Sequence, residues 1–257
     1  MNLHFNIDLS SKYKSPTQSI RCMSEDWVGR NLFCPICGNP RISHYPNNTP
    51  VGDFFCEHCR SDFELKSKES KSGSLGKTIP DGAYHTMIER IKSFNNPNFL
   101  FLTYNDLTVN NILLVPNYFF VPDIIIKRPP LPDSARRAGW EGCNISIENI
   151  PETGKIYIIK DSELIDKSVV VDKYNQLKGL NKNNMEGRGW LMDTLKIVEQ
   201  MPNDDFTLQQ MYEHEMDLRK IHQDNFHIKA KIRQQLQFLR DKGMIEFLER
   251  GRYRRLF

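Results

Sequence analysis

The chain has no long hydrophobic run and few cysteines, and these scarcities exclude several classes of protein. Its longest uninterrupted apolar stretches, such as Phe99–Leu102, fall far short of the roughly 20 residues that a membrane helix needs. The first residues, Met1 to Asp8, lack the basic start and apolar core of a signal peptide. We therefore expect a cytoplasmic protein with reduced thiols, no disulfides and no membrane partner.

The chain also lacks the composition of a disordered protein. With 39% hydrophobic and 26% charged residues in a length of 257, it can bury the core of one large domain or two ordinary ones. A polar, glycine-bearing stretch at residues 181–189 is typical of a linker. We predict a boundary there, with one domain over residues 1–180 and a second over residues 181–257.

Acidic residues are scarce at the C-terminal end. Residues 226–257 hold nine Lys and Arg against three Asp and Glu, a net charge of +6 in a chain whose total is +3. The remainder therefore sums to −3. Such a concentration of basic charge is typical of a protein that binds a polyanion, most often nucleic acid.

Four of the six cysteines form two C-x2-C pairs, Cys34 with Cys37 and Cys56 with Cys59. In a reducing compartment this spacing predicts a four-thiolate zinc site, and Gly38 follows the first pair where the turn favours a flexible residue. Four thiolates close the coordination sphere, so the zinc is expected to be structural. The other two cysteines, Cys22 and Cys143, are expected to be buried thiols.

The second cysteine pair lies between two strand-like segments, residues 51–55 and 63–66, which predict a hairpin. If its turn is centred between residues 58 and 59, Asp53 faces Glu64, with Cβ atoms roughly 5 Å apart. Lys66 shares the face of Glu64, because side chains alternate along a strand. Two adjacent carboxylates favour a divalent cation that prefers oxygen, and a nearby lysine can orient a water.

The hairpin resembles the PD-(D/E)xK nuclease motif, which holds Mg²⁺ for phosphodiester hydrolysis. Two features keep an exposed charged hairpin open as the alternative. The Glu-x-Lys pattern recurs at Glu69 and Lys71, and the first half reads Gly52-Asp53 instead of Pro-Asp. The copy at Glu64 is favoured because Phe63 and Leu65 give it a strand context.

The flanking sequence predicts an α/β layout with a mixed sheet. A helix preceded by a Ser15 capping box comes before the hairpin, and a second is expected to begin at Asp81. A buried strand is expected at 98–103, and further strands at 112–115 and 155–159. Between them, a proline-rich segment over residues 128–140 is expected to form a loop. Its Arg136, Arg137 and Trp140 suit contact with phosphates and a base, and an ordinary surface loop stays open as the alternative.

The C-terminal region has the pattern of a winged helix. Three helices are predicted. The first covers residues 190–201, the second begins at a Thr207/Gln210 capping box, and the third begins near His227. The third would bury Ile228, Ile232, Leu236 and Leu239 and leave Arg233, Gln234 and Gln237 facing the major groove. Two strands then turn at Gly251 to form a wing that contacts the DNA backbone through Arg252 and Arg254.

Taken together, the zinc hairpin, the Ala135-to-Trp140 loop and the C-terminal run from Ile228 resemble DpnI-type methyl-directed restriction endonucleases over essentially the whole chain. The resemblance implies a PD-(D/E)xK core with a zinc hairpin, followed by an α+β winged helix. It implies a monomer that cleaves double-stranded DNA at GATC sites with N6-methyladenine. Asp53, Glu64 and the Leu65 main-chain carbonyl would bind Mg²⁺, Lys66 would assist the water, and Trp140 would sense the methyl group.

Two other functions fit parts of the sequence. A zinc-ribbon and winged-helix regulator without catalysis is the main alternative, and it has no need of converging Asp53, Glu64 and Lys66. An RNA-binding zinc protein is disfavoured, because the C-terminal domain carries a helix for the major groove and lacks an aromatic stacking platform.

Overall fold

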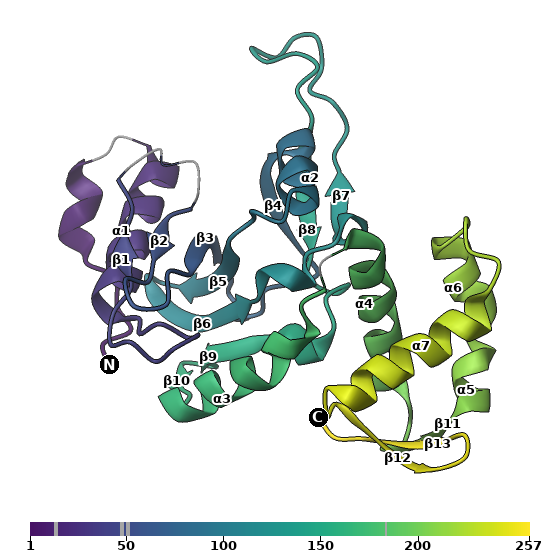
Figure 1. Cartoon of the computed structure of the whole chain (residues 1–257). Coiled ribbons are helices and arrows are strands. Elements are labelled where there is room, and N and C mark those ends of the chain that lie inside the picture. The colour runs from purple at the N-terminus through teal and green to yellow at the C-terminus, as the bar shows by residue number, and fades with distance from the viewer. Residues whose placement is uncertain (13–14, 47–48, 50–51, 183) are drawn as a thin grey trace. The chain divides into compact units, whose positions relative to one another are not determined.

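A computed structural model describes residues 1–12, 15–46, 49, 52–182 and 184–257. Two compact units make up the chain, which Figure 1 colours by residue number. The first contains Met1–Asn149 and Gly154–Lys178, and the second contains Ile150–Thr153 and Gly179–Phe257. Val51 of the predicted hairpin and Asn183 of the predicted linker lie outside the described residues. Within the described residues, no helix is both long and apolar enough to cross a membrane.

The first unit is built on a seven-stranded mixed sheet, as the α/β prediction required. Its order is β1-β2-β3-β5-β6-β9-β10, with β3 and β5 parallel and the other neighbours antiparallel. The strands are β1 (Ser43–His44), β2 (Phe54–Phe55), β3 (Asp62–Glu69), β5 (Asn98–Asn105), β6 (Thr108–Val115), β9 (Ile156–Lys160) and β10 (Glu163–Leu164).

The core of this sheet lies in β5, which the sequence predicted as a buried strand, and in β6, which it predicted as a strand. Phe99 to Leu102 are fully buried, and so are Ile112 to Val115. Runs that are apolar on both faces are typical of a central strand, which is covered on both sides. The hairpin strand β3 pairs with β5, so the core anchors the strand that carries Glu64 and Lys66.

A second, three-stranded antiparallel sheet, of order β4-β8-β7, lies within the same unit. Its strands are β4 (Thr78–Ala83), β8 (Gly142–Ser146) and β7 (Ile125–Lys127). The prediction of a helix starting at Asp81 was wrong, because Asp81 pairs with Cys143 inside the β4–β8 ladder. Helix α2 begins only at Tyr84, after a bulge between Asp81 and Ala83. Parallel strands need a crossover, and here β4 and α2 lie in the connection between β3 and β5.

Three α-helices complete the first unit: α1 (Pro16–Asn31), α2 (Tyr84–Lys92) and α3 (Lys167–Leu177). Helix α1 starts where predicted, with proline in its first turn, but Ser15 makes no side-chain capping bond. Short 3₁₀ helices join the larger elements. They are η1 (Ile7–Lys12), η2 (Asn117–Phe119), η3 (Pro122–Ile124), η4 (Glu152–Gly154) and η5 (Lys178–Leu180).

The second unit has four helices and a small antiparallel sheet of order β11-β13-β12. Its elements are α4 (Met185–Gln200), β11 (Asp205–Thr207), α5 (Leu208–Glu213), α6 (Glu215–Ile221), α7 (Ile228–Asp241), β12 (Ile245–Glu249) and β13 (Arg252–Arg255). Helix α4 begins five residues before the predicted Trp190. Asn184 caps it by accepting from the Gly187 N–H. Half of the predicted linker is therefore the first turn of a helix.

Three helices were predicted in this unit, but the second is interrupted at His214 and forms α5 and α6. The capping, turn and wing predictions are confirmed. Thr207 and Gln210 form a reciprocal capping box at the start of α5. Gly243, with φ of +68°, follows the C-terminal cap of α7, a conformation that favours glycine. Strands β12 and β13 form the wing, and Gly251 in its turn has φ of +77°.

Candidate functional site

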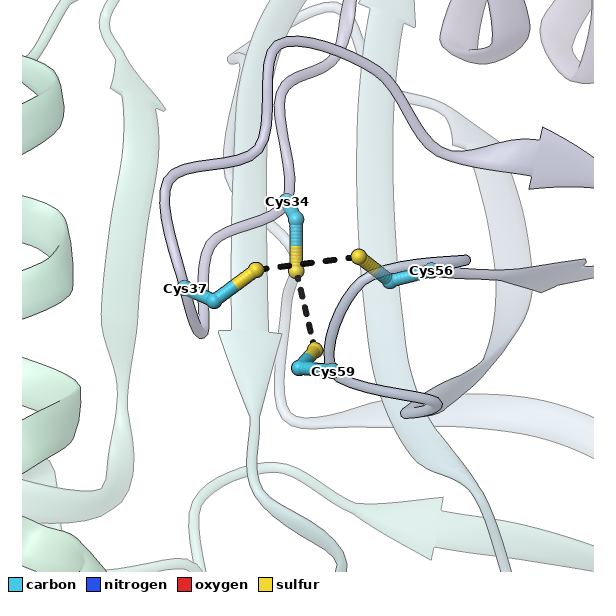
Figure 2. A group of neighbouring side chains, drawn as sticks. All are labelled: Cys34, Cys37, Cys56 and Cys59. Carbon is cyan, nitrogen blue, oxygen red and sulfur yellow. Dashed lines mark hydrogen bonds between the residues drawn. The ribbon is translucent and has the colours of Figure 1, made fainter.

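The four cysteine sulfurs of the two pairs point toward one common centre, as Figure 2 shows. All four Sγ atoms lie within 4.8 Å of one another, with Cys34 to Cys59 at 3.6 Å and Cys37 to Cys56 at 3.7 Å. Sulfurs bound tetrahedrally to zinc at about 2.3 Å are about 3.8 Å apart. The cluster therefore has the donor set and the dimensions of a four-thiolate zinc site.

Both C-x2-C turns use the same backbone arrangement. The Gly38 N–H donates to the Cys34 carbonyl at 2.9 Å, and the Arg60 N–H donates to the Cys56 carbonyl at 2.8 Å. Gly38 and Arg60 both have positive φ, at +75° and +56°. The sequence prediction of a flexible residue after the first pair is thus confirmed, and Arg60 adopts the same left-handed conformation without being glycine.

The local environment has opposite effects on two of these thiols. Burial raises the pKa of Cys34. Burial also opposes ionisation of Cys56, but the main-chain N–H groups of Cys59 and His58 donate to its sulfur and lower its pKa. A metal that binds thiolates would compensate the cost of ionising the buried sulfur. All six cysteines are free, Cys143 is buried as expected, and Cys22 is only half-buried.

The hairpin register agrees with the predicted one. Phe54 pairs with Phe63 and Phe55 with Asp62, and the Asp53 N–H donates to the Phe63 carbonyl at 2.9 Å. Continued by one residue, this register sets Asp53 opposite Glu64. The Asp53 side chain is fixed as well, because its Oδ2 accepts from the Leu65 N–H at 2.8 Å.

Gly52 explains why the residue before Asp53 is not the usual proline. A Cβ atom at this position would lie 2.8 Å from the carbonyl oxygen of Phe63, closer than such contacts occur. Glycine therefore lets the main chain approach β3 closely enough for the Asp53 hydrogen bonds to form.

Asp53, Glu64 and Lys66 line one pocket of about 310 Å³. Lys66 Nζ lies 2.5 Å from Glu64 Oε1, and Arg90 Nη1 from α2 lies 2.9 Å from Glu64 Oε2. Arg21 Nη2 from α1 lies 3.4 Å from Asp53 Oδ1. Each predicted carboxylate is therefore paired with at least one cation in the same pocket.

This charge pattern shifts the pKa values in different directions. Burial, together with the nearby Glu25 and Glu64 carboxylates, raises the pKa of Asp53. Burial acts the same way on Glu64, but attraction to Lys66 and Arg90 outweighs it and lowers the pKa. For Lys66, burial would lower the pKa, and Glu64 and Asp81 together raise it. Paired groups with shifted pKa values in a pocket are typical of a functional site.

Loop 128–141 extends beyond the three-stranded sheet, between β7 and β8 (Figure 1). Its base is closed by two main-chain bonds between Leu131 and the Gly139–Trp140 segment, at 2.9 and 3.0 Å. Trp140 is half-buried, with the guanidinium of Arg137 4.5 Å from the ring centroid and that of Arg128 5.6 Å away. Arg136 is exposed. The predicted loop residues thus combine an accessible aromatic ring with positive charge.

Helix α7 buries the predicted face and exposes the other. Ile228, Ile232, Leu236 and Leu239 are at most 2% exposed. Gln234 and Gln237 are exposed, and so is Arg233, which donates to the Tyr212 hydroxyl at 2.7 Å. In the wing, Arg252 is paired with Glu249 at 2.7 Å and Arg254 with Asp205 at 2.6 Å.

Comparison with known families covers both units. Residues 1–183 match the DpnI family, described as the Dam-replacing family, and residues 186–255 match its C-terminal domain, described as the Dam-replacing HTH domain. The chain belongs to the DpnI family. Membership of the DpnI family indicates a restriction nuclease, and the HTH domain indicates that it binds DNA. The resemblance drawn from the sequence is therefore confirmed at the level of the family.

Sequence reasoning missed four residues of the DpnI-family pocket and its surroundings: Arg21, Glu25, Asp81 and Arg90. Arg21 and Glu25 are one helical turn apart in α1 and form an ion pair at 2.5 Å, a spacing that could have signalled a shared face. Asp81 was hidden by its resemblance to a helix start. Arg90 lies beside the buried Met87 and Ile91 of α2 and is itself only 22% exposed, and no sequence pattern singles it out.

Proposed function

We propose that the chain is a type II endonuclease that hydrolyses double-stranded DNA at GATC sites carrying N6-methyladenine, with Mg²⁺ as cofactor. The main support is one pocket in which Asp53, Glu64 and Lys66 converge, in a chain whose family implies a restriction nuclease. The second unit, residues 179–257 with the short segment 150–153, supplies the HTH fold for DNA binding.

The donors in the pocket suit a divalent cation that prefers oxygen. Asp53 and Glu64 offer carboxylates, and Leu65 between the catalytic positions of β3 offers a main-chain carbonyl, all of which are hard ligands. Without a bound ion, the positive charges of Arg21, Lys66 and Arg90 compensate these two carboxylates. The pocket therefore already attracts cations. A bound Mg²⁺ would polarise the phosphate and make a bound water more acidic.

The protein groups have distinct parts in this proposal. Asp53 is held by the Leu65 N–H, so one of its oxygens is fixed and the other is directed at the pocket, near Arg21. Lys66 donates hydrogen bonds as an ammonium, which suits it to orient the attacking water and to stabilise the charge that develops on the phosphate. The structural zinc of Cys34, Cys37, Cys56 and Cys59 keeps the two hairpin strands in register.

Recognition is proposed for both units. Trp140, with Arg136 and Arg137, would contact the methylated base and nearby phosphates from the first unit. In the second unit, Gln234 and Gln237 would read adenine from the exposed face of α7, helped by Arg233, and the wing residues Arg252 and Arg254 would contact the backbone. N6-methylation leaves adenine one N–H and its N7, so glutamine can still pair with it.

The deciding experiment is incubation of the protein with methylated and unmethylated plasmid, in Mg²⁺ or in EDTA. We expect cutting only of the methylated plasmid and only with Mg²⁺. A non-catalytic regulator would bind the DNA without any Mg²⁺-dependent nicking, so an intact methylated plasmid would favour that alternative.

Variants at the three pocket residues test the assignment within the chain. Asp53→Ala and Lys66→Ala are expected to abolish cutting, while binding to methylated DNA persists. Glu69→Ala and Lys71→Ala are the matched controls, because they remove the second Glu-x-Lys copy, which is exposed at the end of β3 and in the following turn. Loss of binding in both pocket variants would contradict the division of labour between cutting and binding.

A further inference from the structure

Lys66 has a second acidic partner that the PD-(D/E)xK pattern does not contain. Its Nζ lies 2.5 Å from Glu64 Oε1 and also 2.5 Å from Asp81 Oδ1. Glu64 is on the same strand, two residues before Lys66. Asp81 comes from β4, in the other sheet, so the crossover between β3 and β5 returns a carboxylate to the pocket lysine.

Asp81 is the most deeply buried of the three. Its side chain is 7% exposed, against 14% for Glu64 and 19% for Lys66. Oδ1 also accepts from the Gly82 N–H at 2.7 Å, whereas Oδ2 is buried and has no hydrogen-bond partner among the described residues. A buried carboxylate with an unpaired oxygen costs stability. A fold that needed only one anion beside Lys66 already has Glu64.

Glu64 has several partners, and Asp81 can take its place beside Lys66. Both Glu64 oxygens are engaged, one by Lys66 and the other by Arg90. If Glu64 turns toward a cation, as the proposed function requires, Lys66 loses that contact. Asp81 is then the anion that keeps the ammonium in place.

A single side chain connects Asp81 to the Trp140 loop. Arg128 Nη2 donates to the Asp81 main-chain carbonyl at 3.1 Å, and its guanidinium lies 5.6 Å from the Trp140 ring centroid. The guanidinium lies against Gly142, where a Cβ atom would be only 2.0 Å from Nη2. Only glycine at position 142 leaves room for this arrangement.

We propose that Asp81 is a positioning residue that holds Lys66 for cleavage, and that Arg128 couples this position to the contact that Trp140 makes with DNA. The proposal rests on the proposed endonuclease function. It assigns no contact with substrate to Asp81, which acts only through Lys66. It makes the response to methylation depend on a path of three residues, from Trp140 through Arg128 to Asp81, within the first unit.

The first test is Asp81→Asn, which keeps the shape and removes the charge. We expect the single-turnover cleavage rate of a methylated duplex to fall about 100-fold, as for a misplaced catalytic group. Affinity for the same duplex, measured in EDTA, should stay within twofold, and zinc content should not change. The control is Asp172→Asn on the exposed face of α3. An Asp81→Asn rate within twofold of the wild type, or an equal loss of affinity, would overturn the proposal.

A stability measurement checks the contact independently of cutting. Lys66→Met and Asp81→Asn should each lower the melting temperature, and the double variant should lose less than the sum of the two. Lys66→Met leaves the buried Asp81 carboxylate without its cation, and Asp81→Asn removes one of the two anions that compensate Lys66. Additive losses would contradict a direct pair. A wild-type chain that fails to cut methylated DNA would refute the proposed function while leaving this result interpretable.

The coupling through Arg128 is tested by the ratio of cutting rates on methylated and unmethylated DNA. Arg128→Lys and Trp140→Ala should each lower this ratio, and the double variant should lower it no further than the stronger single one, because both act on one path. Arg30→Lys, an exposed residue of α1 paired with Asp26, is the control. If the double variant instead lowers the ratio by the product of the two single effects, Arg128 and Trp140 act separately. That result would contradict the coupling proposal.

Discussion

At the scale of single residues, the pocket is a network of opposite charges, largely buried at Glu64, Lys66 and Asp81 and exposed at Arg21. Glu64 contacts two cations, Lys66 contacts two anions, and Arg21 lies between Glu25 and Asp53. Removing one charged side chain from such a network leaves its partner uncompensated. The loss of stability is far larger than the stability that an exposed ion pair adds. Substitutions here therefore need a neutral variant of the same shape, and a fold measurement beside the activity.

Gly52→Ala is the sharpest test of the hairpin geometry. A methyl group there would meet the Phe63 carbonyl, so the two strands must separate and the Asp53 hydrogen bonds must lengthen. We expect cleavage to fall by tenfold or more, because a shift of about 1 Å at a catalytic group is enough for that. Single-turnover cleavage of methylated DNA measures it.

Gly29→Ala is the control for this prediction. Its Cβ would meet only the edge of the Phe54 ring, at 3.8 Å, and the position is helical. Alanine there should leave cutting unchanged and stabilise the fold slightly, by about 0.5–1 kcal/mol. Equal activities for the two glycine variants would show that the close approach at Gly52 is not needed.

The titration of Lys182, in the second unit, is expected to make the stability of the fold depend on pH. Burial, and the charge of Lys231 nearby, lower its pKa to about 8 from an ordinary 10.5. Between these values the unfolded chain holds the proton and the folded chain does not, so the folded state gains stability as the pH rises. Below pH 8 both states hold it, and the folded state carries the full cost of the buried charge.

Lys182→Met keeps an unbranched apolar side chain beside the Phe238 ring and removes the titrating amine. Denaturant unfolding from pH 7.5 to 10 should then show wild type gaining stability relative to the variant as the pH rises. A difference that is independent of pH would show that Lys182 titrates normally.

At the scale of elements, local patterns predicted more than long-range ones. Three predictions follow from spacing along one segment, and each agrees with the structure. They are the two C-x2-C pairs, the Asp53–Glu64 register and the buried face of α7. Asp81 was misassigned because an Asp before a helix is a common cap, whereas its place in β4 depends on pairing with β8, some 60 residues later in the chain. The start of α4 was missed because Gly187 and Gly189 resemble a linker.

The hairpin with the four cysteines is expected to be an element that folds only with a bound metal. Cys56→Ser should lose bound zinc and lower the melting temperature, because the remaining thiols cannot close a tetrahedral site and the β2–β3 turn is no longer held. Metal analysis and thermal unfolding measure the two effects. Cys22→Ser, a half-buried thiol outside the cluster, should change neither. A folded, active Cys56→Ser protein would contradict the zinc assignment.

At the scale of the whole molecule, the proposed specificity is larger than one methyl contact can provide. Burying a methyl group is worth about 0.8 kcal/mol, roughly a fourfold preference at room temperature. Two readers that each discriminate would multiply their preferences, one at binding and one at cutting. The proposed function assigns one reader to each unit, and the matches over residues 1–183 and 186–255 cover both units.

This arrangement predicts how two substitutions, one in each unit, combine. Trp140→Ala removes the aromatic ring of the first reader, and Gln237→Ala removes an adenine contact of the second. If the readers are independent, the double variant should lose the product of the two single losses in methylated-to-unmethylated cutting, since the effects of independent sites add in free energy. Competition cleavage of mixed methylated and unmethylated duplexes measures this ratio. A double variant no worse than Trp140→Ala would mean that the second unit supplies affinity alone, and that methylation is read once.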